Sequence, residues 1–236
     1  MTDPQTVPAG GVRQFRFVPP PGSTSILLVR HGESAPARPE APFPLVDGHG
    51  DPELAPEGRA QADRVADRLD GEPLQALYVS NLRRTSETAA PLARRLGLQP
   101  EVVPDLREVH LGDWEGGLFR IRMIENSTIA QRMLQEERWD VVPGAEDSER
   151  FAARVRGAIT EIAGRHPDQF VAVFTHGGVI GQALALATGS RPFAFNGADN
   201  ASISHLVVAG DRWIVRTFND TSHLHSGFGT APESPT

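Results

Sequence analysis

Nucleophilic and cationic side chains follow three apolar runs of this sequence, close to the point where each run stops. The three segments are Arg30-His31-Gly32 after residues 26–29, Arg83-Arg84 after residues 76–79, and His176-Gly177-Gly178 after residues 170–174. A neutral imidazole is a nucleophile near pH 7, and guanidinium groups hold phosphate in a fixed geometry. If the segments meet in space, His31 could attack phosphorus while arginines bind the phosphoryl oxygens. Taken alone, the Arg-His-Gly string is equally compatible with an ordinary turn that carries a surface histidine.

The elements that must position these segments alternate along the chain. Apolar residues at helical spacing predict helices over about 57–69, 82–96 and 151–164. Continuous apolar runs predict strands at 26–29, 76–79, 170–174, 203–208 and 213–218. This alternation predicts an α/β fold of three layers, α/β/α, with helices on both faces of a mainly parallel central sheet. The run 211–218 follows Gly210 and is typical of the second, antiparallel arm of an edge hairpin. Because such sheets bind ligands beyond the carboxyl ends of their strands, we expect the three segments at one rim.

The composition excludes several other kinds of site. The chain of 236 residues has no cysteine, which excludes disulfides, thiolate catalysis and Cys-ligated metals. It has no lysine either, which excludes a Walker phosphate loop and a Schiff-base lysine. The formal net charge of −7 argues against a nucleic-acid or membrane-surface partner. Any phosphate site must therefore be a local cationic pocket.

One domain accounts for most of the chain. Residues 1–24 are rich in Pro and Gly and are expected to form an extended N-terminal arm, of which residues 15–18 could dock on the body. We expect a single domain over residues 25–226 and a flexible C-terminal tail over 227–236. No apolar segment is long enough to span a membrane, so we expect a cytoplasmic protein. An edge strand with exposed apolar residues could join two copies as a homodimer.

Longer motifs surround the same residues and follow one another along the chain. They are LVRHGES at 28–34, SNLRRTSETA at 80–89, LREVHLGDWEG at 106–116 and THGG at 175–178, with weaker echoes at 54–62, 143–146, 200–203 and 219–224. In this order the motifs resemble the histidine phosphatase superfamily, which includes the cofactor-dependent phosphoglycerate mutases. The resemblance implies a phosphoglycerate mutase-like fold.

The resemblance also implies a role for each residue that matches a family motif. The catalytic set is His31 as the phosphorylated histidine, Arg30 and Arg84 as phosphate-binding arginines, His176 as the second histidine and Glu108 as the proton donor. Ser34 and Gly177 are expected to bind substrate together with Arg30, Arg84 and His176. These roles need no metal and no other cofactor, and the expected partner is a small phosphorylated substrate.

Chemistry sets two conditions on these assignments. His31 must keep one ring nitrogen free, so its other nitrogen should donate to a backbone carbonyl. Glu108 would protonate the leaving oxygen and then, as a carboxylate, take a proton from the attacking water. Without the surrounding motifs, Arg84 would be interpreted as a helix-surface arginine and Glu108 as a solvated loop acid.

Two details favour hydrolysis over transfer between hydroxyl groups. The mutases carry Asn six residues after the nucleophilic histidine, where this sequence has Ala37, and the segment 112–116 resembles the phosphatase branch. We therefore predict a metal-independent phosphatase that acts on phosphomonoesters through phospho-His31. Phosphoglycerate mutase-type transfer and non-catalytic binding of a phosphorylated ligand are the alternatives.

Two insertions are expected to shape specificity, at 35–50 and at 119–142. The second carries four arginines, Arg120, Arg122, Arg132 and Arg138. It could be a lid that contacts an anionic leaving group, or a solvated helical flap.

Overall fold

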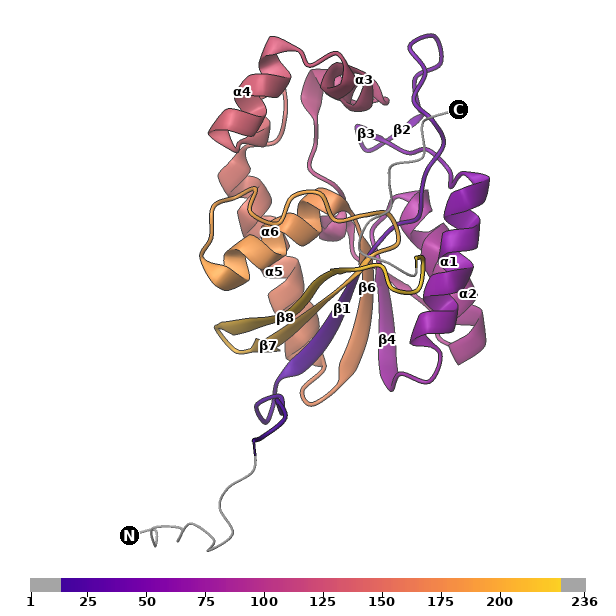
Figure 1. The fold of residues 1–236 in the computed structure, drawn as a ribbon, viewed down its shortest axis with the longest axis vertical. Helices are drawn as coiled ribbons and strands as arrows, with labels where there is room; N and C mark the ends of the chain where they lie inside the picture. Colours follow the sequence, from indigo (N-terminus) through magenta and orange to yellow (C-terminus); the bar gives the residue numbers. More distant parts are fainter. Residues whose placement is uncertain (1–13, 226–236) are drawn as a thin grey trace, which may run out of the picture.

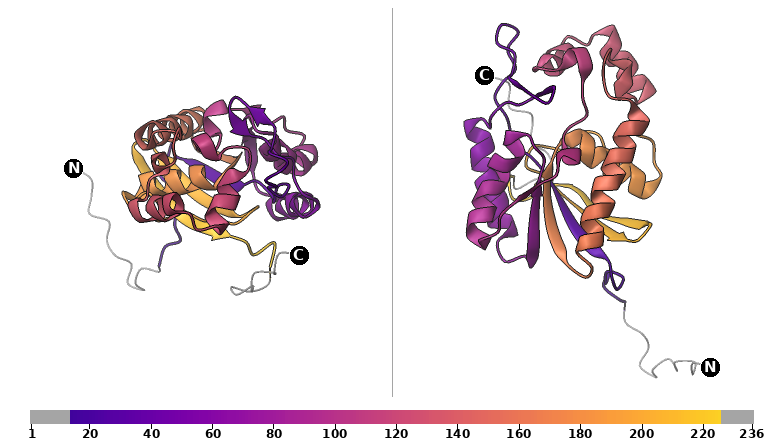
Figure 2. Two further views of the ribbon diagram at one scale, coloured as in Figure 1. Left: turned by 90° about the horizontal axis from the view of Figure 1, so that it is seen from above. Right: turned by 180° about the vertical axis from the view of Figure 1, so that it is seen from behind.

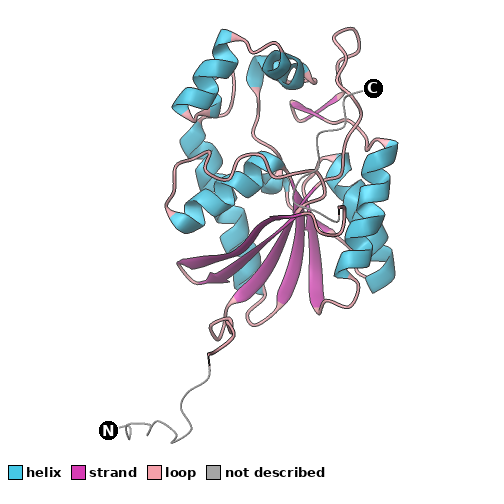
Figure 3. Cartoon of the chain, in the orientation of Figure 1, coloured by secondary structure: helices cyan, strands magenta, loops and turns pink. Residues whose placement is uncertain are grey.

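The computed structural model describes residues 14–225, and a six-stranded sheet lies at its centre (Figure 1, Figure 3). The strands in order across the sheet are β5 (Glu101–Val102), β4 (Leu74–Val79), β6 (Phe170–Thr175), β1 (Thr24–Arg30), β7 (Ile203–Ala209) and β8 (Arg212–Asp220). A separate small hairpin consists of β2 (Leu45–Val46) and β3 (His49–Gly50). The sequence pattern does not predict β5 or this hairpin, because two-residue strands carry no periodicity.

The sheet is parallel at its centre and antiparallel at one side. Strand β6 is parallel to both β1 and β4, and β4 is parallel to β5. Strands β7 and β8 form an antiparallel hairpin, and β7 is also antiparallel to β1. The prediction of a mainly parallel sheet with an antiparallel edge hairpin is therefore confirmed. Pairing of two copies along the β8 edge stays a prediction.

Helices connect the parallel strands and begin and end at residues that favour helix termini. The helices are α1 (Pro56–Leu69), α2 (Arg83–Leu96), α3 (Leu118–Ile124), α4 (Thr128–Glu136), α5 (Ser148–Arg165) and α6 (Gly177–Thr188). Proline at the first position suits the start of α1, and Gly97 ends α2 in the left-handed conformation. The side chain of Asp147 accepts hydrogen bonds from the N–H groups of Glu149 and Arg150 and caps α5. The predicted helices over 57–69, 82–96 and 151–164 are confirmed within a few residues.

Helices cover both faces of the sheet, so the three-layer prediction is confirmed (Figure 2). Side chains of β1 alternate between the two faces. Ile26 and Leu28 pack in the core shared with α5 and α6, whereas Leu27 and Val29 pack in the core shared with α1 and α2. All four side chains are buried, and each contributes about 1.5–3 kcal/mol of transfer free energy.

The two insertions lie beyond the carboxyl ends of the strands (Figure 1). The first holds β2 and β3, and the second forms α3, α4 and a 3₁₀ turn at Trp139–Val141. Both therefore occupy the end of the sheet at which the three predicted site segments emerge.

The termini are only partly described. Of the expected arm, Phe15 and Val18 are exposed, and Phe17 lies with its ring centroid 3.7 Å from the Arg216 guanidinium carbon. Residues 1–13 of the arm and the expected tail at 227–236 lie outside the described residues. Within residues 14–225, no helix combines the length and apolarity needed to cross a bilayer.

Candidate active site

The carboxyl ends of β1, β6 and β4 lie side by side because these neighbouring strands run parallel. Arg30 is opposite Thr175 in this register, so His31 and His176 become neighbours, with ring centroids 5.2 Å apart. Arg84 lies in the first turn of α2, which follows β4. The structure thus brings together the side chains that the sequence places after three separate strands.

His31 has one ring nitrogen engaged and one left for the pocket. Its Nδ1 lies 2.8 Å from the carbonyl oxygen of Gly32, and because a carbonyl only accepts, Nδ1 carries the proton and Nε2 keeps its lone pair. Burial, followed by the charges of Arg84 and Arg30, holds the pKa of His31 well below its usual value. The imidazole is therefore neutral at pH 7, in the tautomer that nucleophilic attack by Nε2 requires.

His176 is buried behind His31. Its Nε2 lies 2.9 Å from Oγ of Ser80, and within the described residues its buried Nδ1 has no hydrogen-bond partner. Oγ of Ser80 also accepts the N–H of Leu82 and lies 3.1 Å from Oγ1 of Thr85, and in one arrangement it donates its own proton to Nε2. In that arrangement Nδ1–H of His176 is a free donor beside the His31 ring. Burial, with Arg84 and His31 next, holds the pKa of His176 well below its usual value.

Arg84 is buried and Arg30 is half-buried, and backbone carbonyls hold both guanidinium groups. Nη1 of Arg84 donates to the carbonyl of Gly50 at 2.9 Å, and Nη1 of Arg30 donates to that of Ala198. Burial lowers the pKa of Arg84 to about 10 and also lowers that of Arg30, against the opposing effect of Glu108 on both. Both side chains remain cationic at pH 7, and each keeps N–H groups that an anion can occupy.

Glu108 faces this cationic group from a loop between two short 3₁₀ helices. Its Oε1 accepts the N–H of Val109 at 3.0 Å, and its Oε2 accepts the N–H of Gly178 at 3.1 Å. A Cβ atom on Gly178 would lie 2.5 Å from Oε1, so only glycine leaves room for the carboxyl in this position. The first turn of α6 thus fixes Glu108 as well as His176.

Arg154 of α5 holds the backbone of the Glu108 loop. Its guanidinium donates to the carbonyls of Asp105, Arg107 and Glu108 at 2.8–2.9 Å. It also forms two hydrogen bonds with the Glu146 carboxylate, at 2.7 and 2.8 Å. The sequence pattern does not identify Arg154, because nothing in its helical spacing distinguishes it from a surface arginine.

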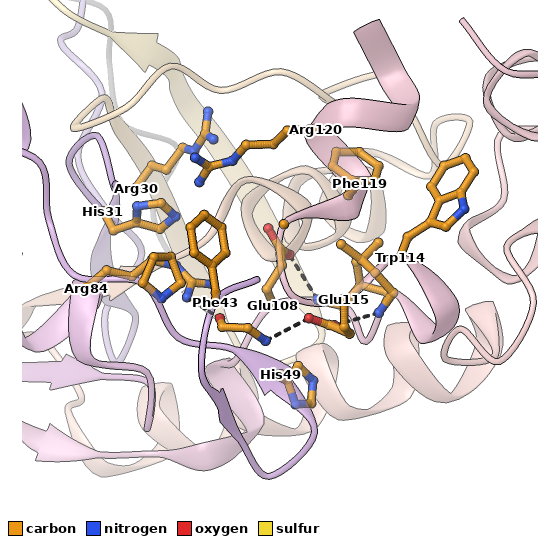
Figure 4. A pocket seen from close by; sticks show the side chains of 15 residues that line it. Arg30, His31, Phe43, His49, Arg84, Glu108, Trp114, Glu115, Phe119 and Arg120 are labelled. Carbon is orange, nitrogen blue, oxygen red and sulfur yellow. Dashed lines mark hydrogen bonds between the residues drawn. The ribbon is translucent and has the colours of Figure 1, made fainter. Parts of the chain in front are cut away.

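A cavity of about 130 Å³ opens in front of these groups (Figure 4). The residues that line it beyond the predicted set include Phe43, His49, Leu111, Trp114, Glu115, Phe119 and Arg120. Glu115 joins two walls, since its carboxylate accepts the N–H groups of Gly50 at 2.7 Å and Leu111 at 2.8 Å. The cavity has room for a phosphoryl group next to His31, Arg30 and Arg84.

Some predicted residues lie behind the cavity wall. Ser34 is buried, and its hydroxyl accepts a hydrogen bond from Nη2 of Arg120 at 2.6 Å. Gly177 packs against Arg30, whose Nε would be 3.4 Å from an added Cβ. Neither these two residues nor the fully buried His176 is among the residues that line the cavity, and direct substrate contact by any of the three stays a prediction.

The arginines of the second insertion separate into two groups. Arg122, Arg132 and Arg138 pair with Glu125, Glu136 and Asp140 on exposed surface. Only Arg120 lines the cavity. Within residues 14–225, no three His, Asp or Glu side chains are arranged to hold a metal ion.

The sequence is similar to one protein family and to individual proteins that resemble this chain along most of their length. The sequence profile described as "Histidine phosphatase superfamily (branch 1)" matches residues 26–221. Phosphoglycerate mutase-like protein 4 of Arabidopsis thaliana is 36% identical over 220 residues, which cover 86% of this chain and 91% of that protein. The metal-independent phosphoserine phosphatase of Arabidopsis thaliana is 34% identical over 211 residues and covers 86% of this chain and 84% of its own length.

A solved structure agrees in fold. The mycobacterial glucosyl-3-phosphoglycerate phosphatase in complex with VO₃ superposes with a TM-score of 0.70 at 30% identity, covering 84% of this chain and 99% of that one.

Proposed function

Because this chain belongs to the histidine phosphatase superfamily (branch 1) and is by that membership a phosphoric monoester hydrolase, we propose that it hydrolyses small phosphomonoesters through a phosphohistidine on His31, without a metal ion. The observation that carries the proposal is the bond from Nδ1–H of His31 to the Gly32 carbonyl at 2.8 Å. It leaves Nε2 with its lone pair at the wall of a cavity that also holds two arginines and a carboxyl group.

In the first half of the reaction, the phosphoryl group passes from the substrate oxygen to His31. Nε2 attacks phosphorus, the P–N bond forms, and the P–O bond to the leaving group breaks. Negative charge on the equatorial oxygens is held by Arg30, Arg84 and the free Nδ1–H of His176. Protonated Glu108 gives its proton to the departing oxygen, which leaves as an alcohol.

In the second half, water releases the phosphoryl group. Glu108, now a carboxylate, takes a proton from a water molecule, whose oxygen attacks phosphorus as the P–N bond breaks. The products are inorganic phosphate and His31 in its starting tautomer. All charge stabilisation comes from guanidinium and imidazole N–H groups, which supports an activity that needs no metal, as the name of the Arabidopsis phosphoserine phosphatase relative states for that protein.

Phosphate release from para-nitrophenyl phosphate tests the proposal. We expect wild-type activity to persist in EDTA, the His31→Ala variant to lose it, and His225→Ala, which changes an exposed histidine, to keep it. Rapid quenching with labelled substrate should trap a phosphoenzyme that is stable in alkali and labile in acid. Activity in His31→Ala equal to that of the wild type would exclude His31 as the nucleophile.

The mutase alternative differs in the fate of the phosphoryl group. Incubation with 3-phosphoglycerate should yield free phosphate, whereas a mutase would yield 2-phosphoglycerate and depend on a bisphosphorylated primer. Isomerisation faster than phosphate release would replace the hydrolase proposal with the mutase one.

A further inference from the structure

The segment 198–202, which leads into β7, supports His31 from outside the cavity. The backbone carbonyl of His31 accepts two hydrogen bonds from this segment, one from the N–H of Ala201 at 3.2 Å and one from Nδ2 of Asn200 at 3.0 Å. None of the five residues of the segment, all of them described, is among those that line the cavity. The segment therefore holds the chain after β1 without forming part of the cavity wall.

Arg30 depends on the same segment for its backbone, its side chain and part of its charge balance. Its N–H donates to the carbonyl of Ser202 at 3.1 Å, and its Nη1 donates to the carbonyl of Ala198. Burial lowers the pKa of Arg30, and the charges of Glu108 and Asp199 act in the opposite direction. A displacement of the segment would therefore move the guanidinium that the proposed mechanism places on the phosphoryl group.

The register of the antiparallel strands brings the end of β8 to this segment. Val29 of β1 is opposite Ile203 of β7, and Ile203 is opposite Asp220 of β8. The residues just before β7 and those at the end of β8 are therefore neighbours. The motif at 219–224, which takes no part in the proposed reaction, begins at this place.

Two side chains of that motif bind the segment. Oδ1 of Asn219 accepts the N–H of Asp199, and Nδ2 of Asn219 donates to Oδ2 of Asp199, both at 2.7 Å. Both bonds require a side chain with an acceptor and a donor, which an amide provides. Nε2 of His223 lies 3.0 Å from the carbonyl of Ala201 and donates to it, because a carbonyl only accepts.

The backbone of the segment needs this support. Ala201 has a φ of 58° and Asn219 has a φ of 57°, both in the left-handed region. This region is unfavourable for alanine, whereas asparagine adopts it more readily. The bonds from Asn219 and His223 therefore hold the segment in a conformation that its own residues do not favour.

We propose that Asn219 is a positioning residue for phosphate binding: its paired hydrogen bonds with Asp199 keep the segment 198–202 in the shape that places the Arg30 guanidinium at the cavity. This role of Asn219 rests on the proposed function for the task of Arg30. Asn219 is not among the residues that line the cavity, so it acts through the segment and not by contact with the phosphoryl group.

Asn219→Gly removes both side-chain bonds and keeps the left-handed backbone, which glycine adopts without strain. We expect the affinity for inorganic phosphate, measured by phosphorus NMR titration, to fall about 3- to 10-fold, because two hydrogen bonds are lost while Arg30 itself remains. KM for para-nitrophenyl phosphate should rise with it. The ratio of aryl to alkyl phosphate rates should not change, since Glu108 keeps its own hydrogen bonds.

Asn126→Gly is the matched control. Asn126 also has a left-handed backbone, with a φ of 50°, but it lies between α3 and α4. This variant should bind phosphate as the wild type does. Phosphate affinity in Asn219→Gly equal to that of the wild type would overturn the proposal.

Exchange of the two side chains tests the pair itself. Asn219→Asp alone sets a second carboxylate against Asp199, so at pH 8 it should weaken phosphate binding at least as much as Asn219→Gly. The double variant Asp199→Asn/Asn219→Asp again has one amide and one carboxylate, and the carboxylate can accept both the backbone N–H and the amide N–H of position 199. It should recover the wild-type affinity within about 3-fold. Failure of the double variant to recover affinity would overturn the proposal.

A double-mutant cycle with Arg30→Met shows whether the effect passes through Arg30. In that background, Asn219→Gly should cost little further phosphate affinity. A fully additive loss would mean that Asn219 supports the protein independently of Arg30, and would overturn the proposal.

Phosphate binding also separates this role of Asn219 from the phosphatase proposal, because binding needs no hydrolysis. An affinity that falls in Asn219→Gly and recovers in the double variant, in a protein that hydrolyses no ester, would support the positioning role and refute the phosphatase. Hydrolysis with a phosphate affinity that Asn219→Gly leaves unchanged would do the reverse.

Discussion

The backbone N–H of Gly178 donates to Oε2 of Glu108 at 3.1 Å, and a Cβ on Gly178 would lie 2.5 Å from Oε1 of the same carboxyl. One residue therefore both holds the proposed proton donor and leaves room for it. Because the contact is with the far end of a side chain that has rotatable bonds, a methyl group at position 178 would displace the carboxyl rather than unfold α6.

We accordingly expect Gly178→Ala to lower kcat by on the order of 100-fold for alkyl phosphates, whose leaving oxygen needs a proton. The loss should be much smaller for aryl phosphates, which leave as stabilised anions. Gly164→Ala is the control, because no atom lies within 4 Å of its added Cβ. A loss that is independent of the leaving group would argue against Glu108 as the acid.

The neighbours Arg83 and Arg84 should differ sharply in phosphate binding. Arg84 is buried at the cavity, whereas Arg83 is exposed and pairs with Glu87 at 3.0 Å and Glu53 at 3.3 Å. Arg84→Met should weaken the binding of inorganic phosphate, measured by calorimetry, about 10- to 100-fold, because a charged hydrogen bond is lost. Arg83→Met should change it little. The reverse order would move the phosphate site to the helix surface.

The two buried histidines should make the folded protein sensitive to mild acid. Burial holds the pKa values of His31 and His176 well below 6.5 in the folded state, whereas both histidines titrate near 6.5 in the unfolded chain. As the pH falls below about 6.5, the unfolded state takes up protons that the folded state does not. The free energy of unfolding should therefore decrease by up to about 1.4 kcal/mol per pH unit for each histidine, until the folded-state pKa is reached.

Urea titrations between pH 7.5 and pH 5 measure this dependence. Other groups also titrate in this range, so the informative quantity is the difference between the wild type and His31→Asn, which removes one of the two titrations. The variant should show a shallower loss of stability towards pH 5. Parallel curves would mean that His31 is protonated equally in both states.

The sequence predicts the parts of the site that a parallel sheet positions. Arg30 ends β1, and His31 and His176 directly follow β1 and β6. The apolar runs of these strands and the rule for ligand sites in α/β sheets therefore suffice to bring the three residues together. Helix α6 is not predicted as a helix, because it is apolar on all sides and carries no amphipathic period.

The parts that the sequence does not predict depend on contacts between distant loops. Arg120 differs from the other three insertion arginines in its hydrogen bonds to the hydroxyl of Ser34 and the carbonyl of Ala35. These residues lie 86 and 85 positions earlier in the sequence. Ser80 bonds His176 across 96 residues, and nothing in its motif distinguishes it from a helix-preceding serine. Such contacts are set by tertiary packing, which a local pattern does not record.

Arg154 offers a test of how the acid is positioned from outside the cavity. Its guanidinium bonds three loop carbonyls, including that of Glu108, and the Glu146 carboxylate. Arg154→Met leaves Glu146 without its cation, and breaking a largely buried pair should cost roughly 3 kcal/mol of stability in urea unfolding. Arg154→Lys should recover part of the stability, because it keeps the charge, but not the loop geometry, because an ammonium cannot span three carbonyls and a carboxylate. At a temperature where Arg154→Lys stays folded, kcat for alkyl phosphates should therefore fall more than kcat for aryl phosphates. Arg156→Met is the control, because Arg156 lies on the same helix but contacts the Trp213 ring, and this variant should keep both rates. A uniform fall in both rates would mean that Arg154 supports the fold alone and not the placement of Glu108.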